Sequence, residues 1–278
     1  MINRNEILLK SKKKLFLNLN GVHNTIFSGN GLEFKELRGY TTSDDIRHIN
    51  WKVTSRSLNP TVNIFNEDKQ LNIVLVYLNS GSISFGSVRS KQDTMVETLL
   101  SLTQAGILSN DMVSTIFFSE DEDKFYKPTK HKSIIDINID TAYKENPIGR
   151  SINYEKLTQL LLYKIKKKSL IFIMGDFLEF ENKLNFNLIA SKHELYCAII
   201  RDKFEENLEL YGEFNIVDTN SNKEQDIFLT PKTVKKYNEK LKKYDEELYR
   251  YFDSCKISYE KIYTCDDVQD KLNRLVIN

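Results

Sequence analysis

LNIVLVYL, residues 71–78, is the stretch that decides the fold of this chain. Short apolar runs with β-branched side chains form strands that are buried on both faces of a parallel sheet. Comparable runs follow at residues 112–118 (MVSTIFF), 170–174 (LIFIM), 194–200 (ELYCAII) and 257–263 (ISYEKIY). These runs predict the strands of one central sheet.

Helical patterns separate most of these strands. Within residues 90–108, apolar side chains from Met95 to Ile107 recur at the spacing of one helix face. Further helices are predicted at residues 154–165, at 231–254 and from Asp266 onward. Thr230 and Pro231 suit the N-cap and the first position of the longest helix. Because strands and helices alternate, we expect an α/β fold: a mainly parallel sheet with helices on both faces.

The chain divides into an N-terminal extension and a larger domain. Residues 70–278 contain the strands and helices above, together with an antiparallel excursion near the sheet edge at residues 213–229. Residues 1–69 contain one further predicted strand, TVNIFNE at residues 61–67. Because short apolar and charged stretches alternate through much of this segment, we interpret it as a folded extension and not as a linker.

The charge balance argues against a nucleic-acid partner. Forty Lys and Arg residues stand against 39 Asp and Glu residues, which gives a formal net charge of +1. Such a chain has no overall field that attracts phosphates. The two basic runs, residues 10–14 and 164–168, fit solvated helix faces or ends.

Cysteine usage and hydropathy predict the compartment. Cys197, Cys255 and Cys265 show no metal-binding spacing, and three thiols cannot all pair within one chain. The first residues lack the apolar core of a signal peptide, and no apolar run approaches the roughly 20 residues that span a bilayer. We expect a cytoplasmic protein without a transmembrane segment, peripheral at the inner membrane only through a partner.

The sequence offers no catalytic motif. It contains no G-x-x-x-x-G-K-[ST] loop for nucleotide phosphates, no G-x-S-x-G elbow and no H-E-x-x-H helix. Adjacent acids such as Asp44 and Asp45 are common at turns and do not face each other as an acid and base pair must. We therefore expect a protein that is not an enzyme.

Hydroxyl and carboxylate side chains follow two of the predicted strands. Open α/β sheets bind ligands at the carboxyl ends of their strands. Loops are predicted at this end at residues 79–87, 119–130 and 175–179. Ser80 and Ser82 alternate in the first loop, and Asp176 directly follows the strand LIFIM. Oxygen ligands of this kind suit a hard cation such as Mg²⁺; the same residues also fit a structural role as helix caps and turn residues.

The segment GLEFKELRGYTTSDDIRHINWKVTSRS, residues 31–57 and called the signature block below, surrounds the only tryptophan with opposite charges. Its candidate interaction residues are Glu33, Arg38, Asp44, Asp45, Arg47, Trp51 and Arg56, and Glu36 and Lys52 add further charges. An ion-pair network that fastens the extension to the domain is one interpretation. A surface for a protein partner is the other, because Arg and Trp are enriched in binding hot spots.

These segments together resemble domain-of-unknown-function family 58 (DUF58). The resemblance rests on the signature block and the FNED that follows it, and on NSGSISFGS, MVSTIFFSE, LIFIMGDFLE and ELYCAIIRDKFEENL. It implies a von Willebrand factor A-like domain with a Rossmann-like sheet and a metal-ion-dependent adhesion site at its top. It also implies an association with MoxR-type AAA+ ATPases, whose genes often lie beside those of the family.

The implied metal site departs from the family pattern at its first position. Such a site normally begins Asp-x-Ser-x-Ser, and this chain has Leu78 in place of the aspartate. Ser80, Ser82 and Asp176 remain as metal-ligand candidates, with Thr129 as a further hydroxyl. We describe the site as degenerate, with Mg²⁺ as the cofactor to test.

The resemblance implies a function without catalysis. We expect an adaptor that works with a MoxR-type AAA+ ATPase in the remodelling or assembly of an unknown client protein. Two alternatives stay open. One is a metal-dependent hydrolase that uses Ser80, Ser82 and Asp176, and the other is an envelope-associated scaffold that makes peripheral contact through Lys10–Lys14.

Overall fold

The computed structural model describes residues 33–42, 44–57, 59–66, 70–178, 185–219 and 223–277. The basic run at residues 10–14 lies outside this set. The described residues fall into two compact units, a small unit of residues 33–70 and a large unit of residues 71–277. No helix among them is long and apolar enough to cross a membrane.

A six-stranded sheet forms the centre of the large unit. Its strands are β3 (Asn72–Leu78), β4 (Met112–Phe118), β5 (Glu122–Thr129), β6 (Leu170–Gly175), β7 (Glu194–Arg201) and β10 (Ser258–Tyr263), in the order β10-β7-β6-β3-β4-β5. All neighbours are parallel except β4 and β5, which are antiparallel. The expected α/β fold with a mainly parallel sheet is confirmed.

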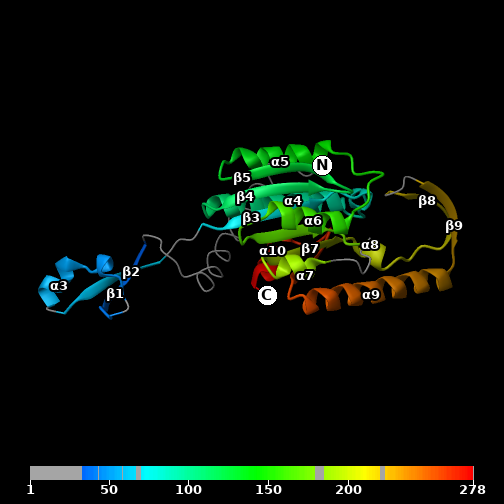
Figure 1. The fold of residues 1–278 in the computed structure, drawn as a ribbon. Coiled ribbons are helices and arrows are strands. Elements are labelled where there is room, and N and C mark those ends of the chain that lie inside the picture. Colours follow the sequence, from blue (N-terminus) through cyan, green and yellow to red (C-terminus); the bar gives the residue numbers. More distant parts are fainter. Residues whose placement is uncertain are drawn as a thin grey trace. The chain divides into compact units, whose positions relative to one another are not determined.

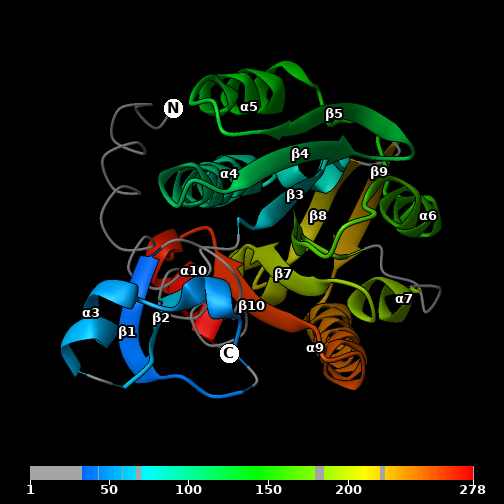
Figure 2. The ribbon, with the colours of Figure 1, turned by 60° about the vertical axis from the view of Figure 1, so that its left-hand side comes forward.

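Helices cover both faces of this sheet (Figure 2). They are α4 (Lys91–Leu108), α5 (Ser133–Lys144), α6 (Tyr154–Lys164), α7 (Phe186–Ala190), α8 (Lys203–Glu206), α9 (Pro231–Ser254) and α10 (Val268–Ile277). One face packs against α4 and α10, and the other packs against α6, α7 and α9. The sheet is therefore the middle layer of three.

The central strand β3 explains why LNIVLVYL is apolar without a break. Val74, Val76 and Leu78 face one core, where Leu157 of α6 and Phe252 of α9 are also buried. The alternate residues of β3 are buried as well, against the face that α4 covers. A strand with helices on both sides has no solvent face, so the alternation of apolar and polar residues disappears.

The segment 119–130, which we expected to be a loop at the ligand-binding end, is mostly strand β5. That expectation is wrong because β5 lies at the sheet edge, where only one side of the strand is paired. An edge strand accommodates charged side chains and Pro128, so its apolar signal is weak. The helix α5 that follows was also not predicted.

The stretch 213–229 forms a hairpin of two strands, β8 (Gly212–Asp218) and β9 (Lys223–Leu229). They pair antiparallel in a sheet of their own and not on the edge of the central sheet. The hairpin leads directly into α9, which begins at Pro231 with Thr230 and Thr233 forming a capping box (Figure 1). Most side chains of the hairpin strands β8 and β9 are exposed.

The small unit is built on two antiparallel strands, β1 (Glu33–Gly39) and β2 (Thr61–Asn66). Between them lie the 3₁₀ helix η1 (Ile46–His48) and the helix α3 (Trp51–Ser57). The β2 strand agrees with the prediction from TVNIFNE. Val62 on this strand is buried, and most of the described side chains between residues 36 and 57 are exposed.

Candidate functional site

The structure brings Ser80, Ser82 and Asp176 together at the carboxyl end of the sheet. Strands β3 and β6 are parallel neighbours, so the residues that follow them lie side by side. Ser80 and Ser82 lie at the start of the 3₁₀ helix η2 (Gly81–Ser84), and their hydroxyl oxygens are 2.8 Å apart. The Ser82 hydroxyl also hydrogen-bonds to the Asp176 carboxylate. We call this cluster, with the contacts described next, the strand-end site.

Lys91 supplies a positive charge to this cluster. Its side chain is fully buried, and its Nζ lies 3.2 Å from Asp176 Oδ2 and 2.8 Å and 2.9 Å from the two carboxylate oxygens of Glu205. Burial alone would raise the pKa of Asp176, but the Lys91 ammonium and the Ser82 hydroxyl lower it below its ordinary value. Asp176 is therefore held as a carboxylate paired with lysine.

The local sequence fixes where Lys91 points. Ser90 is the N-cap of α4 and accepts a hydrogen bond from the amide of Asp93, so Lys91 is the first residue of the helix. A cation at this end is disfavoured by the helix dipole. The carboxylates of Asp176 and Glu205 offset that unfavourable position.

Leu78 occupies the place where the implied metal site has an aspartate. Its side chain belongs to the apolar core and packs on Gly175, where an added Cβ would lie 2.8 Å from Leu78 Cδ1. Leu78 therefore contributes to the core and adds no oxygen atom to the strand-end site. A leucine fits at position 78 because Gly175 has no side chain to occupy the same space.

The donor set does not fit a divalent ion. Mg²⁺ needs about six oxygen ligands in near-octahedral geometry at roughly 2.0–2.1 Å. Here the two serine hydroxyls bond to each other, and the carboxylate of Asp176 bonds to an ammonium. Among the described residues no group of three or more His, Cys, Asp and Glu side chains could hold a metal ion. The residues that the sequence predicts as metal ligands therefore lie close together, but their oxygen atoms already bond to other groups of the protein.

Thr129 lies at the other end of the sheet. It pairs with Val113 near the beginning of β4, because β5 runs antiparallel to β4. Its hydroxyl oxygen accepts a hydrogen bond from the amide of His131. The prediction that Thr129 supplies a further hydroxyl to the site is wrong, since the segment was mistaken for a loop.

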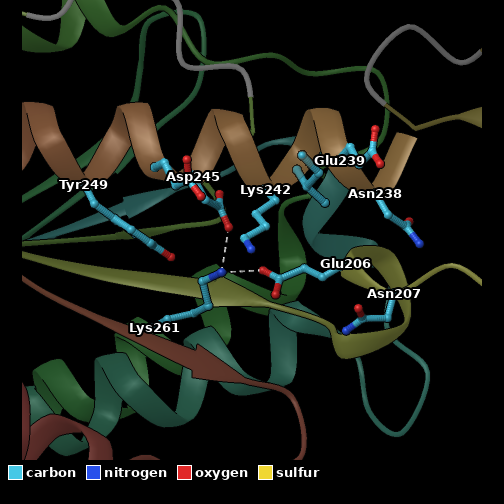
Figure 3. Close-up of a pocket in the computed structure, with 10 residues that line it drawn as sticks. Glu206, Asn207, Asn238, Glu239, Lys242, Asp245, Tyr249 and Lys261 are labelled. Carbon is cyan, nitrogen blue, oxygen red and sulfur yellow. Dashed lines mark hydrogen bonds and ion pairs between the residues drawn. The ribbon is translucent and has the colours of Figure 1, made fainter. Parts of the chain in front are cut away.

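A buried arginine connects the strand-end site to α9. Arg201 is the last residue of β7 and is fully buried. Its Nε donates a hydrogen bond to the backbone oxygen of Asp176 at 2.7 Å, and its Nη2 donates one to Asp245 at 3.0 Å. Lys261 of β10 forms ion pairs with both Asp245 and Glu206, each with a distance of 2.6 Å from its Nζ to a carboxylate oxygen (Figure 3). Burial lowers the pKa of Lys261, but these two carboxylates outweigh it and raise the pKa.

Glu206, Asp245 and Lys261 form the polar floor of a pocket of ≈ 440 Å³ between α8, α9 and β10. Figure 3 shows Asn238, Glu239 and Lys242 on the α9 side and Glu206 and Asn207 opposite them. Because Lys261 bonds to Asp245 and Glu206, the polar floor is already satisfied within the protein. We assign this pocket a structural role in joining the two helices to the sheet.

Sequence reasoning missed Lys91, Glu205, Arg201 and Asp245. One signal was available, because an arginine that ends a mostly apolar strand, as in ELYCAIIR, is placed where burial is expected. A buried Arg needs carboxylate or carbonyl partners. Lys91 gave no such signal, since a lysine beside a helix cap is usually exposed.

Asp202 forms hydrogen bonds with Ser87, the last residue of the NSGSISFGS loop. Its carboxylate accepts hydrogen bonds from the Ser87 amide and hydroxyl, the Phe204 amide and the Thr264 hydroxyl. Burial alone would raise its pKa, but the bonds from Thr264, Ser87 and Phe204 lower it below the ordinary 3.8. The stability that ionised Asp202 contributes is thus fully present above that value and is lost as pH falls through the lower pKa of the folded state.

Asp202→Asn is expected to lower the free energy of unfolding by about 2–4 kcal/mol at neutral pH, because several charge-assisted hydrogen bonds weaken. Urea titrations at a series of pH values should show the difference from the wild type narrowing below pH 3.8, the ordinary pKa of the carboxyl. Asp121→Asn serves as control, since the Asp121 side chain is 75% exposed. A difference that stays constant to the lowest pH would contradict this role.

The signature block makes only local ion pairs within the described residues. Arg38 bonds to Asp44 at 2.7 Å and Arg47 bonds to Asp45 at 2.6 Å. Hydrogen bonds from Arg47 lower the pKa of Asp45 to about 2. Such exposed pairs are screened by water and add little to stability. Trp51 is 66% exposed within its unit.

The remaining charged residues of the block form no ion pair with another residue that the structure describes. Glu36, Lys52 and Arg56 are exposed on β1 and α3. Glu33 begins β1, and its side chain lies outside the described part of the chain. The block therefore does not form one continuous charge network among its described residues.

The fold and the strand-end site define a class: an α/β domain whose polar residues gather at the carboxyl end of a mainly parallel sheet. The chain belongs to the DUF58 family of proteins of unknown function, whose model matches residues 36–247. An uncharacterized protein of Mycobacterium tuberculosis (strain H37Rv) is 24% identical over 233 residues, which cover 80% of this chain and 72% of that protein. An uncharacterized protein of Mycobacterium bovis matches to the same extent.

Two of the solved structures that match this chain come from Bacteroides. The conserved hypothetical protein BatB of Bacteroides thetaiotaomicron matches with a TM-score of 0.47 and 11% identity over 74% of this chain and 97% of that chain. An aerotolerance-related membrane protein of Bacteroides fragilis matches with a TM-score of 0.45 and 11% identity over 74% of this chain and 98% of that one.

Proposed function

We propose that this protein is a non-enzymatic adaptor with a von Willebrand factor A-like domain, and that it works with a MoxR-type AAA+ ATPase to remodel or assemble a client protein. Membership in the DUF58 family supports the proposal, since such ATPases are the partners that the family resemblance implies. The sequence also contains no nucleotide-binding loop of its own. In this proposal the ATPase supplies the energy. The pair works in the cytoplasm and contacts the inner membrane only through a membrane-bound partner.

The exposed face of the signature block carries this proposal. Trp51 is 66% exposed and Ile46 is 62% exposed, and both lie in the segment that joins β1 to β2. The Arg47 side chain, beside Ile46, is 86% exposed. A large aromatic residue with an arginine and an apolar neighbour is the composition of a protein-binding hot spot.

The acids of the block shape this face. Asp44 accepts hydrogen bonds from the amide and hydroxyl of Thr41, and Asp45 is the N-cap of η1. These contacts fix the turn before η1 and α3. We therefore assign Asp44 and Asp45 to the shape of the surface, and Ile46, Arg47 and Trp51 to contact with the ATPase.

The two alternative functions have less support. A hydrolase would need Asp176 as a metal ligand or a base, and the Lys91 ammonium already bonds to that carboxylate. An envelope-associated scaffold would use the basic run at residues 10–14, which lies outside the described part of the chain.

Trp51→Ala is expected to weaken binding of the purified MoxR-type ATPase of the same organism at least about tenfold, the range of a hot-spot residue. The free energy of unfolding should stay within about 0.5 kcal/mol of the wild type, because the side chain is exposed. Isothermal titration calorimetry measures the affinity, and the rate of ATP hydrolysis with and without this protein measures coupling.

Tyr163→Ala is the matched control for this test. Tyr163 of α6 is 74% exposed, so both variants remove an exposed aromatic side chain. Equal losses in the two variants would show that Trp51 has no special role. Absence of any binding or rate change with the wild-type protein would contradict the adaptor proposal itself.

A further inference from the structure

The strand-end site contains the geometry of a cation site. Two serine hydroxyls and a carboxylate, Ser80, Ser82 and Asp176, converge at the ends of neighbouring parallel strands. Such an arrangement lowers the energy of a positive charge placed between its oxygen atoms. The question is which positive charge the chain places there.

We propose that the Lys91 ammonium is the resident cation of the strand-end site and occupies the Asp176 carboxylate, which a divalent ion would need as a ligand. An ammonium group has three N–H donors. Lys91 Nζ has three acceptor atoms within 3.2 Å, one on Asp176 and two on Glu205. All of its hydrogen-bonding capacity is thereby used inside the protein.

The charges around Asp176 favour one monovalent cation over a divalent one. Besides Lys91, the guanidinium of Arg201 lies next to Asp176 and bonds to its backbone oxygen. A divalent ion on the Asp176 carboxylate would meet two positive charges in a buried region, where repulsion is weakly screened. Leu78 adds no compensating negative charge.

The backbone holds Lys91 in place for this role. The Lys91 amide donates to the carbonyl of Phe85 at 2.8 Å, which joins the start of α4 to the loop that carries the two serines. Glu205 arrives on the short helix α8 directly after β7. The cation and its second carboxylate are thus positioned by the same loops that form the site.

The test compares the melting temperature of the full-length wild type and of Lys91→Ala with Mg²⁺, with Mn²⁺ and with EDTA. The wild type should show no saturable shift with either ion. Lys91→Ala should melt at a lower temperature without ions, because Asp176 and Glu205 lose their partner. Ions at ten times their dissociation constant should then raise its melting temperature by about 3 °C.

Lys271→Ala is the matched control. Lys271 also lies between two carboxylates, 2.8 Å from Glu260 and 3.7 Å from Asp266, but its side chain is only partly buried. This variant should gain no response to ions. A gain equal to that of Lys91→Ala would overturn the proposal, because any pair of partly buried acids would then suffice.

Two further results would overturn it. One is a saturable, EDTA-reversible stabilisation of the wild type by Mg²⁺ or Mn²⁺. The other is a folded Lys91→Ala protein that shows no response to ions. If the variant does not fold, ¹H–¹⁵N spectra of the wild-type lysine side chains decide: the Lys91 ammonium signal should be protected and unaffected by Mn²⁺, and selective broadening by Mn²⁺ would overturn the proposal.

Discussion

Lys91→Met is expected to lower the free energy of unfolding by about 3–5 kcal/mol at neutral pH, the usual cost of removing one partner from a buried ion pair. Methionine is unbranched, is only one non-hydrogen atom shorter than lysine and has a similar helix propensity, so the change tests mainly the charge. Asp176 and Glu205 would remain buried without their ammonium partner. Urea unfolding followed by far-ultraviolet circular dichroism measures the effect on the sheet and helices of the large unit.

A double variant separates charge from packing. Lys91→Met combined with Glu205→Gln removes one of the two unpaired carboxylates and should recover part of the loss. Lys156→Met is the control, because Lys156 pairs with Asp121 at the surface and should change stability by about 1 kcal/mol or less. A loss for Lys91→Met as small as that of the control would contradict the role given to Lys91.

Arg201→Met is expected to destabilise the protein by a similar amount, about 3–5 kcal/mol, because Asp245 would lose a buried partner and the Asp176 carbonyl a donor. Arg201→Lys should recover little of this loss. A lysine has one ammonium group and cannot reach both acceptors with the fork geometry of a guanidinium. The same urea titrations measure both variants.

Arg250→Met is the matched control on α9. Arg250 is exposed, and its recorded hydrogen bond is to the backbone oxygen of Glu246 on the same helix. Its loss should change the free energy of unfolding by about 0.5 kcal/mol or less. Equal effects at Arg201 and Arg250 would show that burial of the Arg201 charge does not determine stability.

Elements with strong local signals were predictable from the sequence. The helix at Pro231–Ser254 has the predicted bounds, because a threonine N-cap and a proline mark its start and a long charged pattern follows. The strand Met112–Phe118 also has the predicted bounds, since both of its faces are buried and most of its residues are apolar. Strand β5 and helix α5 were missed, because an edge strand with charged residues resembles a loop in sequence.

The strand-end site was predictable only in part. The convergence of Ser80, Ser82 and Asp176 follows from a rule of topology, that loops after neighbouring parallel strands meet. The partner of Asp176 does not follow from any local pattern, since Lys91 is 85 residues away from Asp176 and 114 away from Glu205 along the chain. Thr129 was misplaced because its segment was predicted to be a loop, whereas it forms the antiparallel edge strand β5.

A site filled by Lys91 does not respond to the concentration of ions around the protein. A diffusible ion follows mass action, so its occupancy depends on its concentration in the cell. A side chain is tethered, and its effective concentration is set by the fold alone. A cation that the gene itself encodes is present in every folded copy, and neither dilution nor a chelator removes it.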